Sequence, residues 1–256
     1  MLNYQIAEDA KPQVKVLAAA IAVSIGLSLI SWFLPVTAYL VYPLQLFATF
    51  VHEGGHVLAA LLTGSQLESL TVSPDTSGVV WSAPSGWLAA LIISSAGYLG
   101  TTAFGTMMLI WMRYGFSPRL GLYFSAAFIG VMTFVFGLLF PLSSFFTANV
   151  TIGSVAFTVL SGTVLTVALG AIAKYADIKW ATFAFAFLTV QCLLNAFFSL
   201  KDLFLISTLT DGHSDAVNMA SSTGIPAFVW VMIWLGVSVV MLSIGLRIYA
   251  VAQRAK

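Results

Sequence analysis

The chain has 256 residues, of which 60% are hydrophobic and only 7% are charged. A soluble domain carries roughly a quarter charged residues, so this chain has too few charges to cover a water-facing surface, and its composition excludes an ordinary soluble protein. Its formal net charge of +1, without a basic patch, argues against nucleic acid as a partner. No polar stretch is long enough for a second domain, so residues 1–256 are expected to form one integral membrane domain.

Seven stretches of the chain are long and apolar enough to cross a lipid bilayer, which takes about 20 residues of helix. Proline or glycine stands at the edges of several of them, where a helix is expected to begin or end. The pattern predicts an all-α polytopic membrane protein with six or seven transmembrane helices. The predicted stretches are 14–34, 38–62, 87–112, 120–140, 150–173, 180–200 and 225–246.

Two connections and one helix carry further patterns. Residues 65–86 alternate between apolar and polar side chains around Pro74 and Gly78, which predicts a small β-hairpin. Residues 201–224 form a polar segment with three aspartates, and we expect a loop there. In the third stretch, Gly97, Thr101 and Gly105 follow one another at four-residue spacing, which predicts the close approach of another helix.

Cations gather in three groups between and after the predicted helices. With seven crossings all three groups lie on one side of the membrane, which the positive-inside rule would make cytoplasmic. The N-terminal Lys11 and Lys15 would then lie on the other side. The three groups are Arg113 with Arg119, Lys174 with Lys179, and Arg247 with Arg254 and Lys256.

The second stretch contains the sequence His52-Glu53-Gly54-Gly55-His56. Histidines four residues apart lie about 40° apart around a helix and one turn apart along it, so both rings can reach one metal ion. In H-E-x-x-H zinc enzymes the metal lowers the pKa of a bound water to about 7 and the glutamate takes its proton. An ionisable side chain at the middle of a membrane helix costs about 2.5–3.5 kcal/mol, and such groups are usually functional. The motif predicts a Zn²⁺ site with Glu53 as the catalytic base; the alternative is a polar cluster that packs helices together.

A catalytic zinc ion usually has three protein ligands and one open position, so a third ligand is expected from another part of the chain. Asp202 is the first candidate, because Gln191, Asn195 and Asp202 fall on one helix face that would point into the bundle. The alternative for Asp202 is a solvated charge beside Lys201 at the end of the helix. Asp215 is the reserve ligand, since the polar segment could fold back toward the histidines.

These features resemble the site-2 protease family of intramembrane zinc metalloproteases. The shared features are HEGGH in an apolar helix, a hairpin after it, and an aspartate that follows an asparagine on a late helix. In that family a motif of the form N-x-x-P-x-P-x-L-D-G supplies the third ligand and an asparagine that positions the substrate, which implies these roles for Asp202 and Asn195. The stretch from Asn195 to Asp202 lacks both prolines and the glycine, and its spacing is one residue shorter.

The chain is similar over most of its length to the bacterial site-2-protease-like branch of the family. This resemblance implies a multi-pass protein of the bacterial inner membrane with its active site near the cytoplasmic side and a cytoplasmic N-terminus. The loop charges imply the opposite side for the N-terminus, so the orientation stays open. The similar stretches are Ser73-Pro74-Asp75 with Gly78, residues 95–100, Ser214-Asp215-Ala216 and residues 223–227.

The resemblance implies an intramembrane zinc endopeptidase that hydrolyses a peptide bond in or near a transmembrane segment of a membrane-protein substrate. That segment would enter from the lipid bilayer and unwind, and the hairpin is predicted to hold it as an added strand through Leu70, Val72 and Val79. The alternatives are a non-catalytic zinc-binding membrane protein that binds or helps assemble other membrane proteins, and a transporter with a metal site at mid-membrane. The sequence names neither the substrate nor any partner subunit or oligomer.

Overall fold

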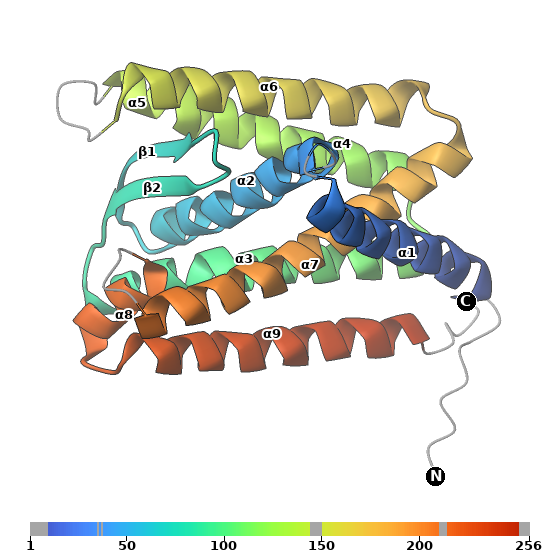
Figure 1. Ribbon diagram of the computed structural model, residues 1–256. Coiled ribbons are helices and arrows are strands. Elements are labelled where there is room, and N and C mark those ends of the chain that lie inside the picture. The colour runs from blue at the N-terminus through green and yellow to red at the C-terminus, as the bar shows by residue number, and fades with distance from the viewer. Residues whose placement is uncertain (1–9, 35, 37, 144–149, 210–213, 251–256) are drawn as a thin grey trace, which may run out of the picture.

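A computed structural model of the protein describes residues 10–34, 36, 38–143, 150–209 and 214–250. Long helices lie alongside one another, and a small two-stranded sheet covers one end of the bundle (Figure 1). The elements in chain order are α1 (Lys11–Phe33), α2 (Ala38–Leu62), β1 (Gln66–Val72), β2 (Gly78–Ala83), α3 (Trp87–Arg113), α4 (Pro118–Val131), the π-helix η3 (Met132–Leu139), α5 (Phe140–Ser143), α6 (Ile152–Tyr175), α7 (Ile178–Leu209), α8 (Asp215–Thr223) and α9 (Ala227–Ala250).

All seven predicted stretches are helical, and the prediction of an all-α polytopic membrane protein with one hairpin is confirmed. Helix α2 differs from the other long helices in its sequence, because the ionisable residues His52, Glu53 and His56 interrupt its apolar stretch. The chain is a multi-pass integral membrane protein. Five segments among the described residues are long and apolar enough to span a bilayer, namely Trp87–Arg113, Pro118–Ser143, Ile152–Tyr175, Ile178–Leu205 and Ala227–Ala250.

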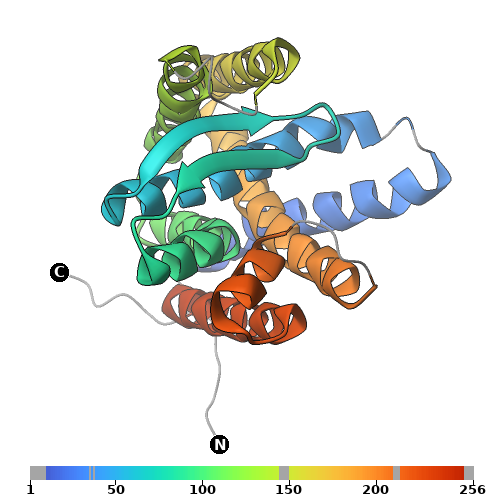
Figure 2. The same ribbon diagram turned by 90° about the vertical axis from the view of Figure 1, so that its left-hand side faces the viewer.

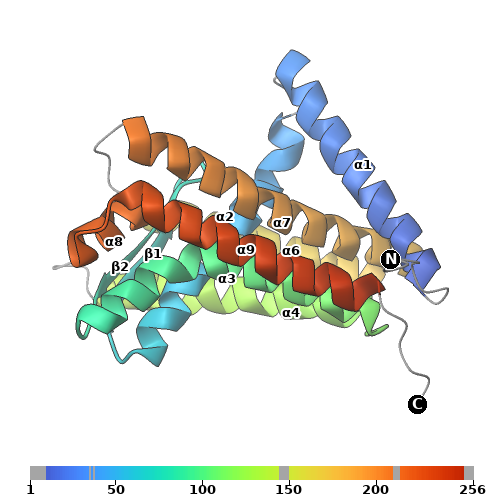
Figure 3. The ribbon, with the colours of Figure 1, turned by 90° about the horizontal axis from the view of Figure 1, so that it is seen from below.

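Helices α1 and α2 meet at an angle and together carry the chain from one end of the bundle to the other. Helix α1 begins at the end opposite the hairpin and stops near the middle, and α2 continues from there to the hairpin (Figures 1 and 3). The start of α1 and the end of α2 therefore lie toward opposite ends of the bundle. The prediction of six or seven transmembrane helices is compatible with the five apolar segments found among the described residues.

The hairpin prediction for residues 65–86 is confirmed, with β1 and β2 paired antiparallel over Gln66–Val72 and Gly78–Ala83. Helix α2 holds the turn between them. Tyr42 donates its hydroxyl hydrogen bond to the Pro74 carbonyl (2.8 Å), and Thr49 donates to the Thr76 carbonyl (2.6 Å). Within the turn, the Ser77 hydroxyl and backbone N–H both donate to Asp75, and these bonds hold the pKa of Asp75 below its usual value. The turn is thereby fixed over the helix that carries the HEGGH motif.

The two strands of the hairpin have different outer edges. The backbone N–H of Val72 donates to the Thr158 hydroxyl of α6 (2.7 Å), and that hydroxyl also lies 3.3 Å from the Val72 carbonyl oxygen. The backbone groups of Val72 therefore point away from β2, and by the alternation of an antiparallel ladder those of its partner Gly78, and of Val80, point away from β1. Helix α6 occupies the outer edge of β1 at Val72, while Gly78, the first residue of β2, borders the cavity described below.

The polar segment 201–224 is largely helical in its described part, contrary to the expected loop. Helix α7 continues to Leu209, because Leu200 and Leu203 extend its buried face beyond the predicted end. The short helix α8 follows from Asp215, and its Ala216 and Met219 pack in one cluster with these leucines. Residues 210–213 lie outside the described part of the chain.

Helix α3 lies at the centre of the bundle, in contact with α2, α7, α8 and α9. The small-residue stripe of Gly97, Thr101 and Gly105 was predicted to lie close to another helix, and it lies close to two, α7 and α2. A β-carbon at Gly105 would lie 2.8 Å from the Leu193 side chain of α7, and one at Gly97 would collide with the two histidines of α2. The stripe thus brings both α7 and α2 close to the middle of the molecule.

Candidate metal centre

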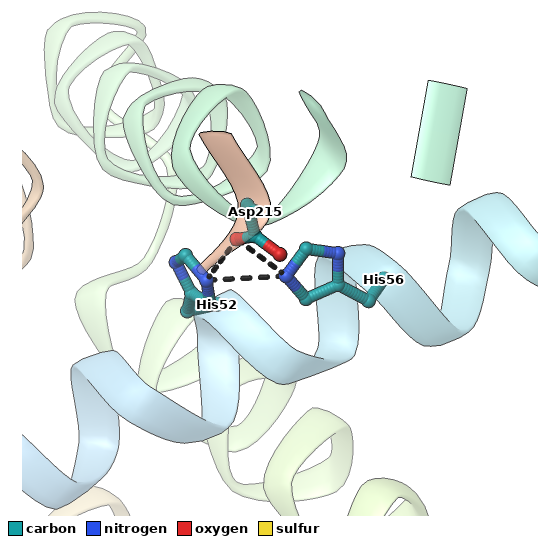
Figure 4. Close-up of side chains that lie close together, drawn as sticks. All are labelled: His52, His56 and Asp215. Carbon is teal, nitrogen blue, oxygen red and sulfur yellow. Dashed lines mark hydrogen bonds and ion pairs between the residues drawn. The ribbon is translucent and has the colours of Figure 1, made fainter. Parts of the chain in front are cut away.

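Helix α2 presents His52 and His56 on one face, one turn apart (Figure 4). Their ring centroids lie 4.9 Å apart, and their Nε2 atoms are separated by 3.1 Å. His56 is buried, whereas His52 is partly exposed. This is the arrangement expected from the i and i+4 spacing of the motif.

A backbone carbonyl fixes the orientation of the His56 ring. Its Nδ1 lies 2.7 Å from the carbonyl oxygen of Ile93 on α3, and a carbonyl can only accept a hydrogen bond. Nδ1 therefore carries the proton and donates, which leaves the lone pair of Nε2 directed at His52 and the site. Metal-ligating histidines are commonly held in this way by a carbonyl behind the ring.

Asp215 supplies a third side chain to this pair, from the first residue of α8 (Figure 4). Its Oδ2 lies 3.3 Å from His52 Nε2 and 3.2 Å from His56 Nε2. Burial raises the pKa of Asp215, but the hydrogen bonds of His56 and His52 and, whenever these rings are protonated, their charges lower it by more, so the pKa lies well below its usual range. The aspartate is thus a carboxylate at neutral pH, which is the form that binds metals.

The three donor atoms fit a zinc ion by chemistry and by spacing. Zinc binds imidazole nitrogen and carboxylate oxygen tetrahedrally at about 2.0–2.2 Å, which separates two ligand atoms by about 3.3–3.6 Å. The separations of 3.1, 3.2 and 3.3 Å among His52, His56 and Asp215 are close to that range. All their ligand atoms lie within 4.8 Å of one another. Among the described residues, this group of possible metal ligands consists of these three side chains.

Asp202 and Asp215 were both considered as the third ligand, and only Asp215 can be compared with this geometry. The side chain of Asp202, on α7, lies outside the described part of the chain. Asp215 follows Ser214, whose hydroxyl accepts a hydrogen bond from the Val217 N–H and so caps the start of α8. This cap fixes where the carboxylate of Asp215 leaves the helix.

Glycine residues make room for the metal centre. A β-carbon at Gly97 of α3 would collide with the Nε2 atoms of both His52 and His56. Within the HEGGH motif itself, a β-carbon at Gly54 would lie 2.5 Å from the Phe128 ring, and one at Gly55 would collide with the Ala96 carbonyl oxygen. Helix α2 can approach α3 at Gly55 and Gly97, and α4 at Gly54, this closely only because these positions lack side chains.

Glu53 lies beside the metal centre and under the hairpin turn. Its side chain is buried, and a β-carbon at Gly78 would lie 2.5 Å from its Oε1 atom. Adjacent positions on a helix lie about 100° apart, yet Glu53 and His52 both line the cavity described next. The first residue of β2 thus packs directly on the predicted catalytic base.

A cavity of about 800 Å³ lies next to these residues, within the range of ligand-binding pockets. Helix α2 contributes His52 and Glu53 to its wall, and the hairpin turn contributes residues 76–78. Helix α7 contributes Gln191 and Asn195, the polar stripe expected to face the interior. The amide nitrogen of Gln191 is buried and has no hydrogen-bond partner within the described residues. The cavity therefore brings polar groups of α7 opposite the metal centre.

The three hairpin residues predicted to hold a substrate differ in accessibility. Leu70 and Val72 are fully buried, and the backbone of Val72 is bonded to Thr158. Val79 is 45% exposed but does not line the cavity, whereas its neighbour Gly78 does. Of the residues in the two strands, only Gly78 of β2 lines the cavity.

Two aromatic residues behind His52 were missed by the sequence analysis. The Tyr98 ring meets the His52 ring edge-on with centroids 4.6 Å apart, and Trp234 of α9 stacks on Tyr98 at 5.4 Å. Trp234 is held in turn by donating its indole N–H to the Ser95 hydroxyl (3.1 Å). Tyr98 falls within residues 95–100, which carry part of the family resemblance. The resemblance therefore pointed to this stretch, but it did not indicate the contact between Tyr98 and His52.

Comparison with known proteins gives one match. A protein-family model described as peptidase M50B-like matches residues 16–245, which covers most of the chain and includes every residue of the metal centre. No curated protein and no solved structure matches the chain.

Proposed function

This chain belongs to the peptidase M50B-like family, and on that premise we propose that it is a zinc endopeptidase that hydrolyses a peptide bond in or near a transmembrane segment of another membrane protein. The observation that carries the proposal is the buried Glu53 beside the cluster of His52, His56 and Asp215, on the wall of a cavity inside a membrane-spanning bundle. We place the protein, by the same resemblance, in the inner membrane of a bacterium.

We assign His52, His56 and Asp215 as the zinc ligands. The near-tetrahedral spacing of their donor atoms and the carbonyl behind His56 support this assignment. Asp202, the other candidate for the third position, is tested against Asp215 in an experiment below. When bound, zinc polarises the carbonyl group of a peptide bond and lowers the pKa of a water molecule.

Glu53 is the general base of the proposed reaction. Its carboxylate accepts a proton from the attacking water, whose oxygen forms a bond to the carbonyl carbon of the substrate. The carbon–nitrogen bond then breaks, and Glu53 returns the proton to the leaving amine. Burial beneath Gly78 keeps bulk water away from this carboxylate and fixes its position.

The cavity walls supply hydrogen-bonding groups for an unwound segment. A helix that unwinds frees its backbone N–H and C=O groups, which must find partners within the membrane. The outward-pointing backbone groups of Gly78 and Val80 offer a strand edge, and Gln191 and Asn195 offer carboxamides on the facing wall. We expect Val80→Pro, which removes one edge N–H, to lower cleavage, and Val72→Pro to act mainly by unfolding the hairpin. Unchanged cleavage in folded Val80→Pro protein would end the strand-addition hypothesis.

The variant Glu53→Gln tests the catalytic proposal. The protein should keep its zinc, because no ligand is changed, and should lose roughly 10²- to 10⁴-fold in the rate of cleaving a tagged transmembrane peptide in detergent. Glu68→Gln, a carboxylate change on β1 outside the cavity lining, is the matched control.

Equal cleavage by Glu53→Gln and wild-type protein would contradict the proposed role of this residue. If the biological function of the protein survived in Glu53→Gln with zinc still bound, the non-catalytic binding or assembly role would replace the protease.

A further inference from the structure

Helix α7 carries two carboxamide side chains to the cavity that holds the metal centre. Gln191 and Asn195 lie one turn apart on this helix, and both line the cavity together with His52 and Glu53. Helix α7 runs through the middle of the bundle, in contact with α1, α2, α3 and α9 (Figure 2). The two carboxamides therefore belong to an inner wall of the bundle.

The two carboxamides differ in their hydrogen bonds. Asn195 donates an amide N–H to the backbone carbonyl oxygen of Gln191 (3.2 Å), within its own helix. Gln191 is only 4% exposed, and its amide nitrogen makes no hydrogen bond to any described residue. A buried donor without a partner is unfavourable, so such a group in a folded protein calls for an explanation. The cavity that Gln191 borders is where a partner can reach it.

Contacts along α3 place Gln191 close to the metal centre. Gly97 of α3 lies against the Nε2 atoms of both histidines, and Thr101, one turn further along, donates its hydroxyl hydrogen bond to the Gly97 carbonyl (2.8 Å). The Cys192 thiol of α7 donates in turn to the Thr101 carbonyl oxygen (3.7 Å), and Gln191 directly precedes Cys192. One turn of α3 thus separates this part of α7 from the metal ligands, and Thr101 lines the same cavity.

An unwound substrate segment needs the kind of group that Gln191 has to offer. Unwinding exposes backbone carbonyl oxygens, which can only accept hydrogen bonds and must find donors within the membrane. A carboxamide NH₂ group donates two hydrogen bonds. The last side-chain torsion of glutamine is broad and roughly two-fold, so a turn about it brings the NH₂ group to the cavity side. Gln191 can therefore bond a carbonyl of the substrate without breaking a bond to a described residue.

We propose that Gln191, and not Asn195, is the residue of α7 that binds the main chain of the substrate, an inference that rests on the proposed protease function. Its NH₂ group donates to a carbonyl oxygen of the unwound segment beside the scissile bond, which holds that bond at Glu53 and the metal centre. The family resemblance implied this positioning role for Asn195, whose amide is already bonded within α7. The role moves by one helical turn, from Asn195 to Gln191.

Variants of nearly constant volume separate the two carboxamides. Gln191→Met and Asn195→Leu each remove the hydrogen-bonding groups and keep the size of the side chain. Both are made in full-length Glu53→Gln protein, and binding of a fluorescent transmembrane peptide that the wild-type protein cleaves is measured by anisotropy in detergent. Gln191→Met should weaken binding by about 3- to 10-fold, the effect of one lost hydrogen bond, and Asn195→Leu by less than about 2-fold. In the cleaving protein, the same loss should appear as a higher KM.

Zinc content and thermal stability are the controls, because a purely structural role of Gln191 would change them. The Gln191 amide nitrogen has no partner among the described residues, so Gln191→Met should keep its zinc and melt no lower than the parent protein. Unchanged peptide binding in Gln191→Met would overturn the proposal, and so would a lower melting temperature or zinc content in this variant. An equal or larger loss of binding in Asn195→Leu would return the role to the asparagine.

The binding measurement does not depend on cleavage, so this proposal can fail while the protease function stands. Failure of the protease function appears instead as equal cleavage by Glu53→Gln and wild-type protein, whatever the binding result.

Discussion

The metal ligands come from two helices that differ in almost every respect. Helix α2 has 25 residues, and its ligand-bearing turn is packed against α3 so closely that side chains at Gly55 and Gly97 are excluded. Helix α8 has nine residues and is held by contacts such as the bond from the Trp87 indole N–H to the Ser222 carbonyl (2.9 Å). The comparison indicates that two ligands are fixed by the fold, whereas the third arrives on a small peripheral element whose stability is more local.

The largest effect is expected when a ligand is removed from the fixed pair, by which we mean His52 and His56 on α2. We expect His56→Ala to lose zinc on dialysis and to weaken zinc binding by more than about 100-fold, beyond the 10–100-fold typical of changes behind a ligand. Zinc content per purified chain measures the effect. A variant that kept about one zinc per chain would show that the histidines are a packing cluster and not the metal site.

The next test addresses the third ligand. Asp215→Ala should weaken zinc binding by about 100-fold, because one of three protein ligands is lost, while the helix α2 pair remains. Asp202→Ala is the matched control and should bind zinc as the wild type does. The reverse result, with loss in Asp202→Ala alone, would return the third position to α7 and make α8 irrelevant to the metal.

A change in α3 tests how tightly the fixed pair is enclosed. Gly97→Ala should reduce zinc affinity by about 10- to 100-fold without altering any ligand, since the new β-carbon occupies the space at both Nε2 atoms. Gly100→Ala is the control on the same helix, because its β-carbon would meet Gly55 at an ordinary 3.4 Å. Both variants are compared by competition with a zinc chelator, and equal affinities would mean that the histidines have room to move.

The smallest expected effect is a difference in hydrogen exchange between α8 and α2. When zinc is removed by a chelator, hydrogen exchange should increase in residues 214–223, because α8 loses its link to α2, and should change little in residues 50–60. Mass spectrometry of peptides from these two segments measures the difference. An equal increase in both would mean that the metal stabilises α2 as much as α8, and the comparison would fail.

The sequence was sufficient for the elements and for half of the metal centre. The apolar stretches gave all seven long helices, the alternation around Pro74 and Gly78 gave the hairpin, and the spacing of His52 and His56 placed both on one helix face. Each of these is a local pattern with a fixed period, so it can be read without knowing the fold.

What could not be predicted depends on contacts between distant residues. Asp215 lies 159 positions after His56, and no local period relates a short capped helix to a histidine on another one. The angle at which α1 and α2 meet was also hidden, because each stretch alone is long enough for a membrane span. The extension of α7 beyond residue 200 was missed since the polar Lys201 and Asp202 suggested an end, although Leu203 continues the buried face.

The close contact of α2 with its neighbours has a consequence for how the HEGGH motif tolerates change. In a general H-E-x-x-H pattern the two middle positions are free to vary, because they point away from the metal. Here Phe128 stands over Gly54 and the Ala96 carbonyl over Gly55, so the middle positions are set by the neighbouring helices. Transferring this motif to another scaffold, or a foreign H-E-x-x-H segment to this one, would succeed only together with the facing surfaces of α3 and α4.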